Sequence, residues 1–420
     1  MVQAQTYETL FVARQPVLDA ALGTWGYFHY YRRSQEHTYS EFTDPLQATL
    51  AVIQCMPACL DTCSLPHKAL IQLPGQALLA GIPHALSPAC VVPVIPLNGY
   101  NEPKHLEALA TLRRDGYSLA LDPQGGELGE TPLLDLADIV ILDLRGPKAD
   151  QLIKMAPGLR AAGLTLLAKR VETVAAFNLA KSLGCTQFSG YFFREPEVLS
   201  QRKVSAVETT RLSLLNLLAQ PDPNTDELVA TIEADASVSY RVLSLLNSAS
   251  FSLAKKVASV RQAVLMAGWV NLCAWLRVIV LADLAPSSKA RELLHLSAQR
   301  AKFFELLALS SGRQAKADSL FMLGLFSLLP AMLDMPMPGI VERLSLEDGL
   351  AAALCGQPSP YDPWLALALA IEETRWDDMG QLVTRLGLPT GSVAEAYNAS
   401  FSWADKLTNA MPGENGKTLR

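Results

Sequence analysis

The strongest constraint on the fold is a change in hydrophobic pattern near the middle of this 420-residue chain. In the first half, short apolar runs alternate with helix-like segments. These runs, each of strand length, cover 11–19, 68–73, 90–95, 117–122, 138–144 and 164–168. Strands that alternate with helices favour a parallel sheet, either open or closed into a barrel. The first half has about 200 residues, which is near the lower limit of chain length for an eightfold barrel.

The second half has the pattern of an all-helical domain. Apolar residues recur there at helical spacing, and the strand signal is gone. Helices are expected at 225–250, 259–268, 291–312, 320–333 and 363–387. The polar stretch 195–210 is the expected boundary, which predicts an α/β domain at 1–200 and an all-α domain at 201–420.

The segment 264–284 is apolar enough to suggest a membrane span. Arg277 lies within it, and a charge at the centre of a spanning helix costs about 2.5–3.5 kcal/mol. Two buried helices meeting near Gly268 are therefore predicted, without membrane insertion. The first ten residues lack the basic and apolar regions of a signal peptide, which predicts a cytoplasmic protein. The net charge of −6 argues against nucleic acid as a partner.

The chain has seven cysteines, an odd number that fits a reducing compartment better than a disulfide framework. Cys55, Cys59 and Cys63 recur every four residues, which would place three thiols on one helical face. Pro57 weakens that geometry, and the spacing differs from the paired cysteines of structural zinc sites. Small core residues are the alternative interpretation of the three thiols. No metal is expected, and the role of these cysteines stays open.

Several segments carry a resemblance to known families. RQPVLD (14–19), ALDPQG (120–125), LADIVILDL (136–144), LLAKRVET (166–173) and GYFFREP (190–196) resemble, in this order, segments of the EAL domain. That family is a TIM-type barrel that hydrolyses cyclic di-GMP with two metal ions. Segments 235–268 and 370–378 resemble the HDOD domain, a metal-free relative of the HD phosphohydrolases. The resemblance implies a bacterial EAL–HDOD signalling protein, with a small EAL-like barrel followed by an all-helical HDOD domain.

The resemblance also shows which metal-site positions have changed. Phe28 stands where the EAL family has a metal-binding glutamate. The other changed positions are Gln72, Pro93, Pro123, Ile141, Lys169 and Ser189. The positions that remain are Arg32, Asp122, Asp143 and Glu172. Asp143 and Glu172 have an alternative reading as residues that end a strand and begin a helix. Two-metal hydrolysis needs several converging carboxylates, so the resemblance implies that this activity is lost.

The second half lacks the His-Asp pair that binds metal in HD phosphohydrolases, because none of the six histidines is followed by aspartate. The corresponding place in the sequence is 324–334, where Ser327 and Leu328 lie in an apolar helix that is expected to pack in the core. His295 is expected to be partly exposed or hydrogen-bonded rather than a metal ligand.

We therefore predict that the chain is not an enzyme and has no cofactor. The leading hypothesis is a regulatory protein that binds other signalling proteins, with the HDOD half as a candidate surface. The alternative is a sensor that binds cyclic di-GMP or another nucleotide without cleaving it. Arg32 would hold a phosphate beside Asp122, and Phe28, Tyr30 or Tyr31 would stack on the base. A third hypothesis, an unrelated enzyme, lacks a nucleophile and base that the sequence identifies.

Overall fold

The computed structural model describes residues 11–32, 67–124, 128–129, 131–146, 149–194, 269–284, 290–344 and 346–410, with single positions between 211 and 262. The chain divides into two compact units. The first consists of Met1–Glu195 and Ala370–Asp377, and the second of Pro196–Leu369 and Asp378–Arg420. The predicted boundary after residue 200, the three cysteines at 55–63 and most of segment 235–268 lie outside the described residues.

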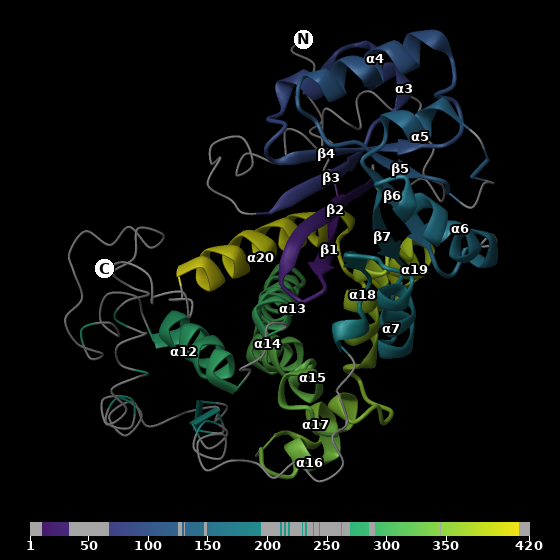
Figure 1. The fold of residues 1–420 in the computed structure, drawn as a ribbon. Coiled ribbons are helices and arrows are strands. Elements are labelled where there is room, and N and C mark those ends of the chain that lie inside the picture. Colours follow the sequence, from purple (N-terminus) through teal and green to yellow (C-terminus); the bar gives the residue numbers. More distant parts are fainter. Residues whose placement is uncertain are drawn as a thin grey trace, which may run out of the picture. The chain divides into compact units, whose positions relative to one another are not determined.

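The first unit contains a closed barrel of eight strands in chain order (Figure 1). The strands are β1 Phe11–Asp19, β2 Thr24–Arg32, β3 Lys68–Gln72, β4 Val91–Pro96, β5 Ala120–Asp122, β6 Ile139–Asp143, β7 Thr165–Lys169 and β8 Gln187–Ser189. Strands β2 to β8 run parallel, whereas β1 is antiparallel to both β2 and β8. The predicted small TIM-type barrel is confirmed, with one reversed strand.

The reversed strand follows from the short link between β1 and β2. A tight turn can join only an antiparallel pair, because a parallel pair needs a long crossover. The Asp19 carboxylate stabilises this turn by accepting hydrogen bonds from the backbone N–H groups of Ala21 and Gly23. The aromatic segment 26–32 therefore lies within a barrel strand, β2, with Phe28 opposite Gln15 of β1.

Helices cover the outside of the barrel (Figure 1). They are α3 Gly75–Leu79, η1 Ile82–Ala85, α4 Pro103–Arg114, α5 Pro132–Leu136, α6 Ala149–Ala161, α7 Val174–Ser182 and η2 Phe192–Arg194. Thr131 and Thr173 cap α5 and α7, each accepting a backbone N–H of the first turn. The barrel interior is an apolar cluster of Val17, Phe28, Leu70, Val92, Val94, Ala120, Ile139, Ile141 and Leu167. These side chains alternate along their strands with outward ones and fill the centre.

In the second unit every regular element among the described residues is helical, as predicted. The helices from α12 onward are α12 Trp269–Leu284, α13 Ala290–Ser310, η3 Gln314–Lys316, α14 Ala317–Phe326, α15 Leu329–Leu333, α16 Met337–Val341, α17 Asp348–Leu354, α18 Asp362–Glu372, α19 Trp376–Leu386 and α20 Thr390–Ala410. The helices predicted at 320–333 and 363–387 are each two helices. The first breaks after Phe326, and the second breaks after Glu372, within a segment grouped with the barrel.

Helices α13 and α14 approach closely at Gly324. A methyl group there would lie 2.4 Å from the backbone nitrogen of Ala301. We expect Gly324→Ala to lower the free energy of unfolding by about 1–3 kcal/mol, because the two helices would have to separate. Gly339→Ala in α16 is the matched control, since nothing lies within 4 Å of its added methyl group. Urea titration of both variants tests this; equal stabilities would contradict the close packing.

By length and composition, one helical segment of the described chain, Gln314–Leu333, is apolar enough to cross a membrane. In the structure, 72% of the 18-residue apolar stretch of this segment is buried. Arg277 of α12, the charge noted in the sequence, is buried and donates hydrogen bonds to the Leu218 carbonyl and to Asp318, at 3.1 and 2.5 Å. A location in the cytoplasm stays a prediction.

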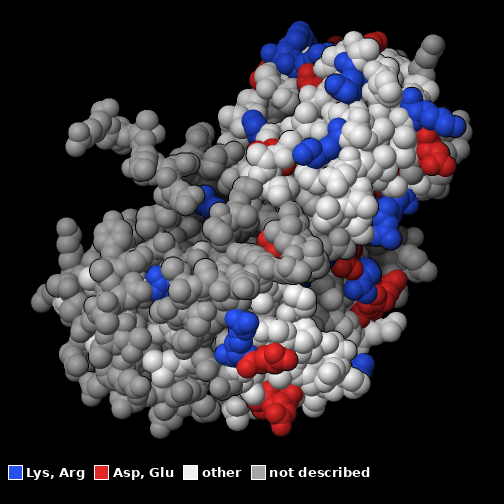
Figure 2. Space-filling model, turned by 60° about the horizontal axis from the view of Figure 1, so that its bottom comes forward, with Lys and Arg blue, Asp and Glu red and all other residues white. Residues whose placement is uncertain are grey.

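Charges of both signs are distributed over the face shown in Figure 2. Basic and acidic side chains lie interspersed on its described part rather than gathering by sign. This mixed surface differs from the continuous basic stripe typical of nucleic-acid binding proteins.

Candidate functional site

A cavity of about 320 Å³ opens at the C-terminal ends of the parallel strands. Its lining residues are Phe28, His29, Tyr30, Leu70, Gln72, Val94, Asp122, Lys169, Thr374 and Trp376. The C-terminal end of a TIM-type barrel is where such proteins carry their functional residues, because the ends of several strands and the loops that follow them meet there. We call this cavity the barrel mouth.

The barrel strands place the polar side chains of the mouth at their ends. Gln72, Asp122 and Lys169 are the last residues of β3, β5 and β7. Phe28 lies deeper, within the apolar cluster, and its ring stacks on that of Tyr30 with centroids 5.9 Å apart. The aromatic segment thus serves two purposes: Phe28 fills the core and Tyr30 faces the cavity.

Lys169 supplies a positive charge to the mouth. Its ammonium nitrogen lies 3.1 Å from the Asp122 carboxylate and 5.8 Å from the centroid of the Phe28 ring. The Lys169 side chain is 22% exposed, whereas that of Asp122 is 4% exposed. Burial lowers the pKa of Lys169, but Tyr30 and Asp122 outweigh this effect and the pKa is raised. Lys169 therefore stays protonated and faces the cavity as a cation.

Tyr30 and His29, two residues of β2 that line the mouth, stay neutral. Burial raises the pKa of the Tyr30 phenol, so its hydroxyl keeps its proton and donates to Gln15 Oε1 at 3.4 Å. Burial and the nearby Arg14 lower the pKa of His29 to about 3, so its ring is uncharged at neutral pH. Neither residue competes with Lys169 as the cation of the mouth.

Three of the four residues that the sequence singled out have described side chains, and Asp143 lies close enough to Lys169 and Tyr30 to raise their pKa values. Asp122 lines the mouth. Asp143 is held by Arg170 through two hydrogen bonds of 2.7 and 2.6 Å. Glu172 accepts a hydrogen bond of 3.4 Å from the Tyr191 backbone N–H. Arg32 is the last residue of β2, and its side chain lies outside the described residues.

The described residues of the mouth do not fit a pair of divalent cations. Val94 pairs in register with Gln72 and belongs to the interior cluster. Pro93, its neighbour in the strand, therefore points to the outer face, so the predicted ligand position is occupied by valine. Asp122 is already paired with Lys169. Among the described residues there is no group of three or more His, Cys, Asp or Glu that could hold a metal.

Thr374 and Trp376 are among the residues of the mouth that sequence reasoning missed. They come from Ala370–Asp377, which covers the end of α18 and the start of α19 and is grouped with the barrel unit although it lies far along the chain. In the sequence, the only feature that drew attention to this segment was the resemblance of residues 370–378 to the HDOD domain. Lys169 was noticed, but only as a reversed charge at a metal position.

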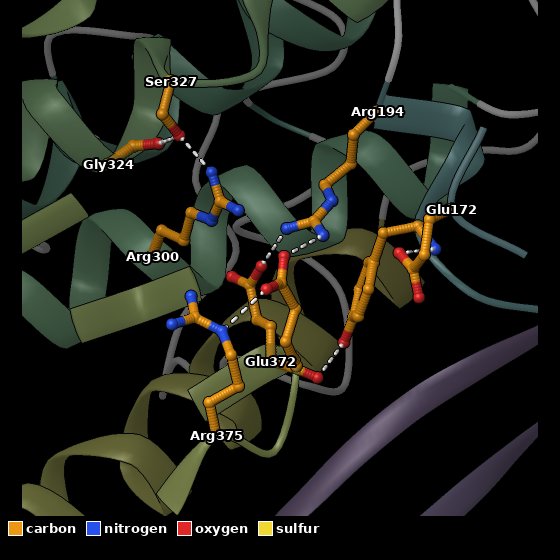
Figure 3. A network of polar contacts seen from close by, with 9 residues as sticks. Glu172, Arg194, Arg300, Gly324, Ser327, Glu372 and Arg375 are labelled. Atoms are coloured by element: carbon orange, nitrogen blue, oxygen red, sulfur yellow. Dashed lines mark hydrogen bonds and ion pairs between the residues drawn. The ribbon is translucent and has the colours of Figure 1, made fainter. Parts of the chain in front are cut away.

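In the second unit, the residues at the position where an HD phosphohydrolase carries its His-Asp pair have a structural role. Ser327 Oγ accepts a hydrogen bond of 2.9 Å from Arg300 and donates one of 2.7 Å to the Gly324 carbonyl (Figure 3). His295 is buried and lies 3.5 Å from Thr408 Oγ1 through its Nδ1. Of the two alternatives expected for His295, hydrogen bonding is confirmed and partial exposure is wrong.

The chain thus consists of an eight-stranded barrel unit and a helical unit, with a polar mouth at the ends of the barrel strands. A family profile described as HDOD domain matches residues 205–332. "Uncharacterized protein YuxH" of Bacillus subtilis strain 168 is 30% identical over 413 residues, covering 96% of this chain and 99% of that protein. The chain therefore belongs to the EAL–HDOD family.

Two further proteins are similar to this chain. "Cyclic di-GMP phosphodiesterase CdgJ" of Vibrio cholerae serotype O1 is 29% identical over 412 residues, covering 97% of this chain and 95% of that protein. A solved structure, "Crystal Structure of EAL domain Protein from Listeria monocytogenes EGD-e", is 14% identical with a TM-score of 0.33. It covers 44% of this chain and 87% of that one.

The prediction that this chain is not an enzyme is overturned by the Vibrio relative. That protein is named a phosphodiesterase and is similar over nearly the whole chain. The prediction rested on single ligand positions in this chain. The predicted signalling partners are untested and stay a prediction.

Proposed function

We propose that the chain acts in cyclic di-GMP signalling and binds this dinucleotide at the barrel mouth, with Lys169 as the contact to a phosphate. The observation that carries the proposal is the position of Lys169. It is a protonated ammonium group at a strand end, mostly buried but open to a cavity of about 320 Å³. The name of the Vibrio relative supplies the ligand class.

The chemistry of the mouth suits a nucleotide. A phosphodiester is an anion, and an ammonium group in a partly desolvated site binds an anion more strongly than one in water. The Tyr30 phenol beside it keeps its proton and so adds no competing negative charge. Aromatic side chains at the mouth offer flat apolar surface to a purine.

The size of the cavity limits how much ligand enters. Pockets for drug-sized molecules span about 300–1,000 Å³. At about 320 Å³ the mouth is near the lower limit. We therefore propose that one half of the dinucleotide enters the cavity and that the other half lies at its rim.

Isothermal titration of the full chain with cyclic di-GMP tests the proposal, with chromatography of the same samples for a linear dinucleotide product. We expect saturable heat with one binding site. A product peak would extend the named activity of the Vibrio relative to this chain. Absence of both heat and product at tens of micromolar ligand would refute the proposal.

Cyclic di-AMP is the matched control ligand, since it carries the same phosphodiester ring with adenine in place of guanine. Binding of both dinucleotides with equal affinity would leave the phosphate contact intact but remove the assignment to cyclic di-GMP. The predicted binding of other signalling proteins is a separate proposal. An affinity pull-down with the full chain tests it.

A further inference from the structure

The segment Ala370–Asp377 joins α18 to α19 and belongs to the barrel unit. It leaves α18 through a Schellman motif, in which the Arg375 N–H donates to the Ala370 carbonyl and the Thr374 N–H to the Ile371 carbonyl, at 2.7 and 3.1 Å. Two of its side chains, Thr374 and Trp376, line the barrel mouth. The chain thus passes from helices of the second unit into the barrel unit and back.

The segment is held against the residues that follow β8 by a network around Arg194 (Figure 3). The guanidinium of Arg194 pairs with Glu372 at 2.8 Å and with Glu373 at 3.0 Å. It also stacks on Tyr191, with its central carbon 3.9 Å from the ring centroid. The Tyr191 hydroxyl donates to the Glu372 carbonyl at 3.0 Å. A doubly paired and stacked arginine fixes the position of the segment far more closely than a single surface ion pair would.

Thr374 has a backbone conformation that threonine seldom adopts. Its φ is 56°, in the left-handed region. The corresponding position of a Schellman motif is usually glycine, and a β-branched residue there is strained by about 1–3 kcal/mol. Strain of this kind tends to persist where the residue has a functional role. Here the strained residue lines the cavity.

From these observations we propose that Trp376 is a specificity-determining residue, which recognises a purine base of the ligand by stacking at the barrel mouth. Arg194 is the positioning residue that holds the segment through Glu372 and Glu373. This inference rests on the proposed binding of a cyclic dinucleotide. It adds that base recognition comes from the segment Ala370–Asp377, whereas Lys169 recognises the phosphate.

Four variants and two ligands test the role of Trp376 by isothermal titration. Trp376→Leu removes the ring and Trp376→Phe keeps one. Trp403→Leu is the matched control at a half-buried tryptophan of α20, which packs on Phe321 and does not line the cavity. Lys169→Met reports on the phosphate contact. Each is titrated with cyclic di-GMP and with cyclic di-UMP, which has the same phosphodiester ring with smaller bases.

We expect Trp376→Leu to weaken cyclic di-GMP binding by about tenfold or more, the effect of removing a base-stacking aromatic ring. The affinity for cyclic di-UMP should fall less. The ratio of the two affinities, which measures the preference for a purine base, should therefore decrease. Trp376→Phe should keep most of the affinity and Trp403→Leu all of it. Lys169→Met should weaken both ligands alike.

Two results would overturn the inference in different ways. If Lys169→Met weakens binding but Trp376→Leu leaves the ratio of the two affinities unchanged, the role of Trp376 is wrong and the proposed function stands. If the wild-type chain binds neither dinucleotide, the proposed function fails and the inference fails with it.

Discussion

Arg194→Ala is expected to lower the free energy of unfolding by about 3–5 kcal/mol, the usual cost of removing one partner of a buried ion pair. The reason is the environment of Glu372. Its side chain is 4% exposed and pairs with Arg194 at 2.8 Å, so the variant would leave a carboxylate buried without this cation. Urea denaturation monitored by circular dichroism measures the loss.

Two further variants separate this effect from a general loss of charge. Arg375→Ala is the matched control, because the Arg375 side chain is 44% exposed and pairs with Glu373 at 2.9 Å. An exposed pair of this kind contributes about 0–1 kcal/mol. Adding Glu372→Gln to Arg194→Ala should recover part of the stability, since the buried charge is removed. If Arg194→Ala and Arg375→Ala lose stability equally, Arg194 does not hold the segment as described.

Lys169→Met is expected to weaken cyclic di-GMP binding by roughly tenfold to a hundredfold, because a charge-assisted contact contributes about 1.5–3 kcal/mol. Lys169→Arg should keep much of the affinity, since a guanidinium also pairs with phosphate. Isothermal titration measures the affinities of both variants. The salt concentration is held constant, because salt screens the charges of this contact and would alter the affinity.

Lys169→Met also leaves Asp122 without the cation it pairs with. The double variant Lys169→Met with Asp122→Asn removes both charges, so it should fold while still binding poorly. Lys68→Met is the matched control: Lys68 begins β3, at the opposite end of the barrel from the mouth. Unchanged affinity in both the single and the double variant would show that Lys169 does not contact the ligand.

Strands β3, β4, β6 and β7 were predictable because they are apolar runs of five or six residues. Strand β8, Gln187–Ser189, is only three residues long and too short for a recognisable pattern. The reversal of β1 depends on a turn at Asp19 rather than on any property of the strand itself. The break after Glu372 was missed because Thr374 occupies a position where glycine is the usual signal.

The candidate site was less predictable, because its pairings join residues that are distant in the sequence. Asp122 and Lys169 each appeared in the sequence, but their ion pair is a property of neighbouring strand ends. Pro93 was assigned to the mouth, whereas the register of β4 gives that place to Val94. Trp376 reaches the mouth only through the fold, and no local pattern connects it to the barrel.

The central claim is that cyclic di-GMP binds at the barrel mouth, and photolabelling tests it most directly. The full chain is irradiated with an azido derivative of cyclic di-GMP, and the labelled peptides are identified by mass spectrometry. We predict labels on peptides that contain Tyr30 or Trp376, and their loss when unmodified cyclic di-GMP competes. Competable labels confined to peptides that contribute no residue to the mouth would contradict the claim.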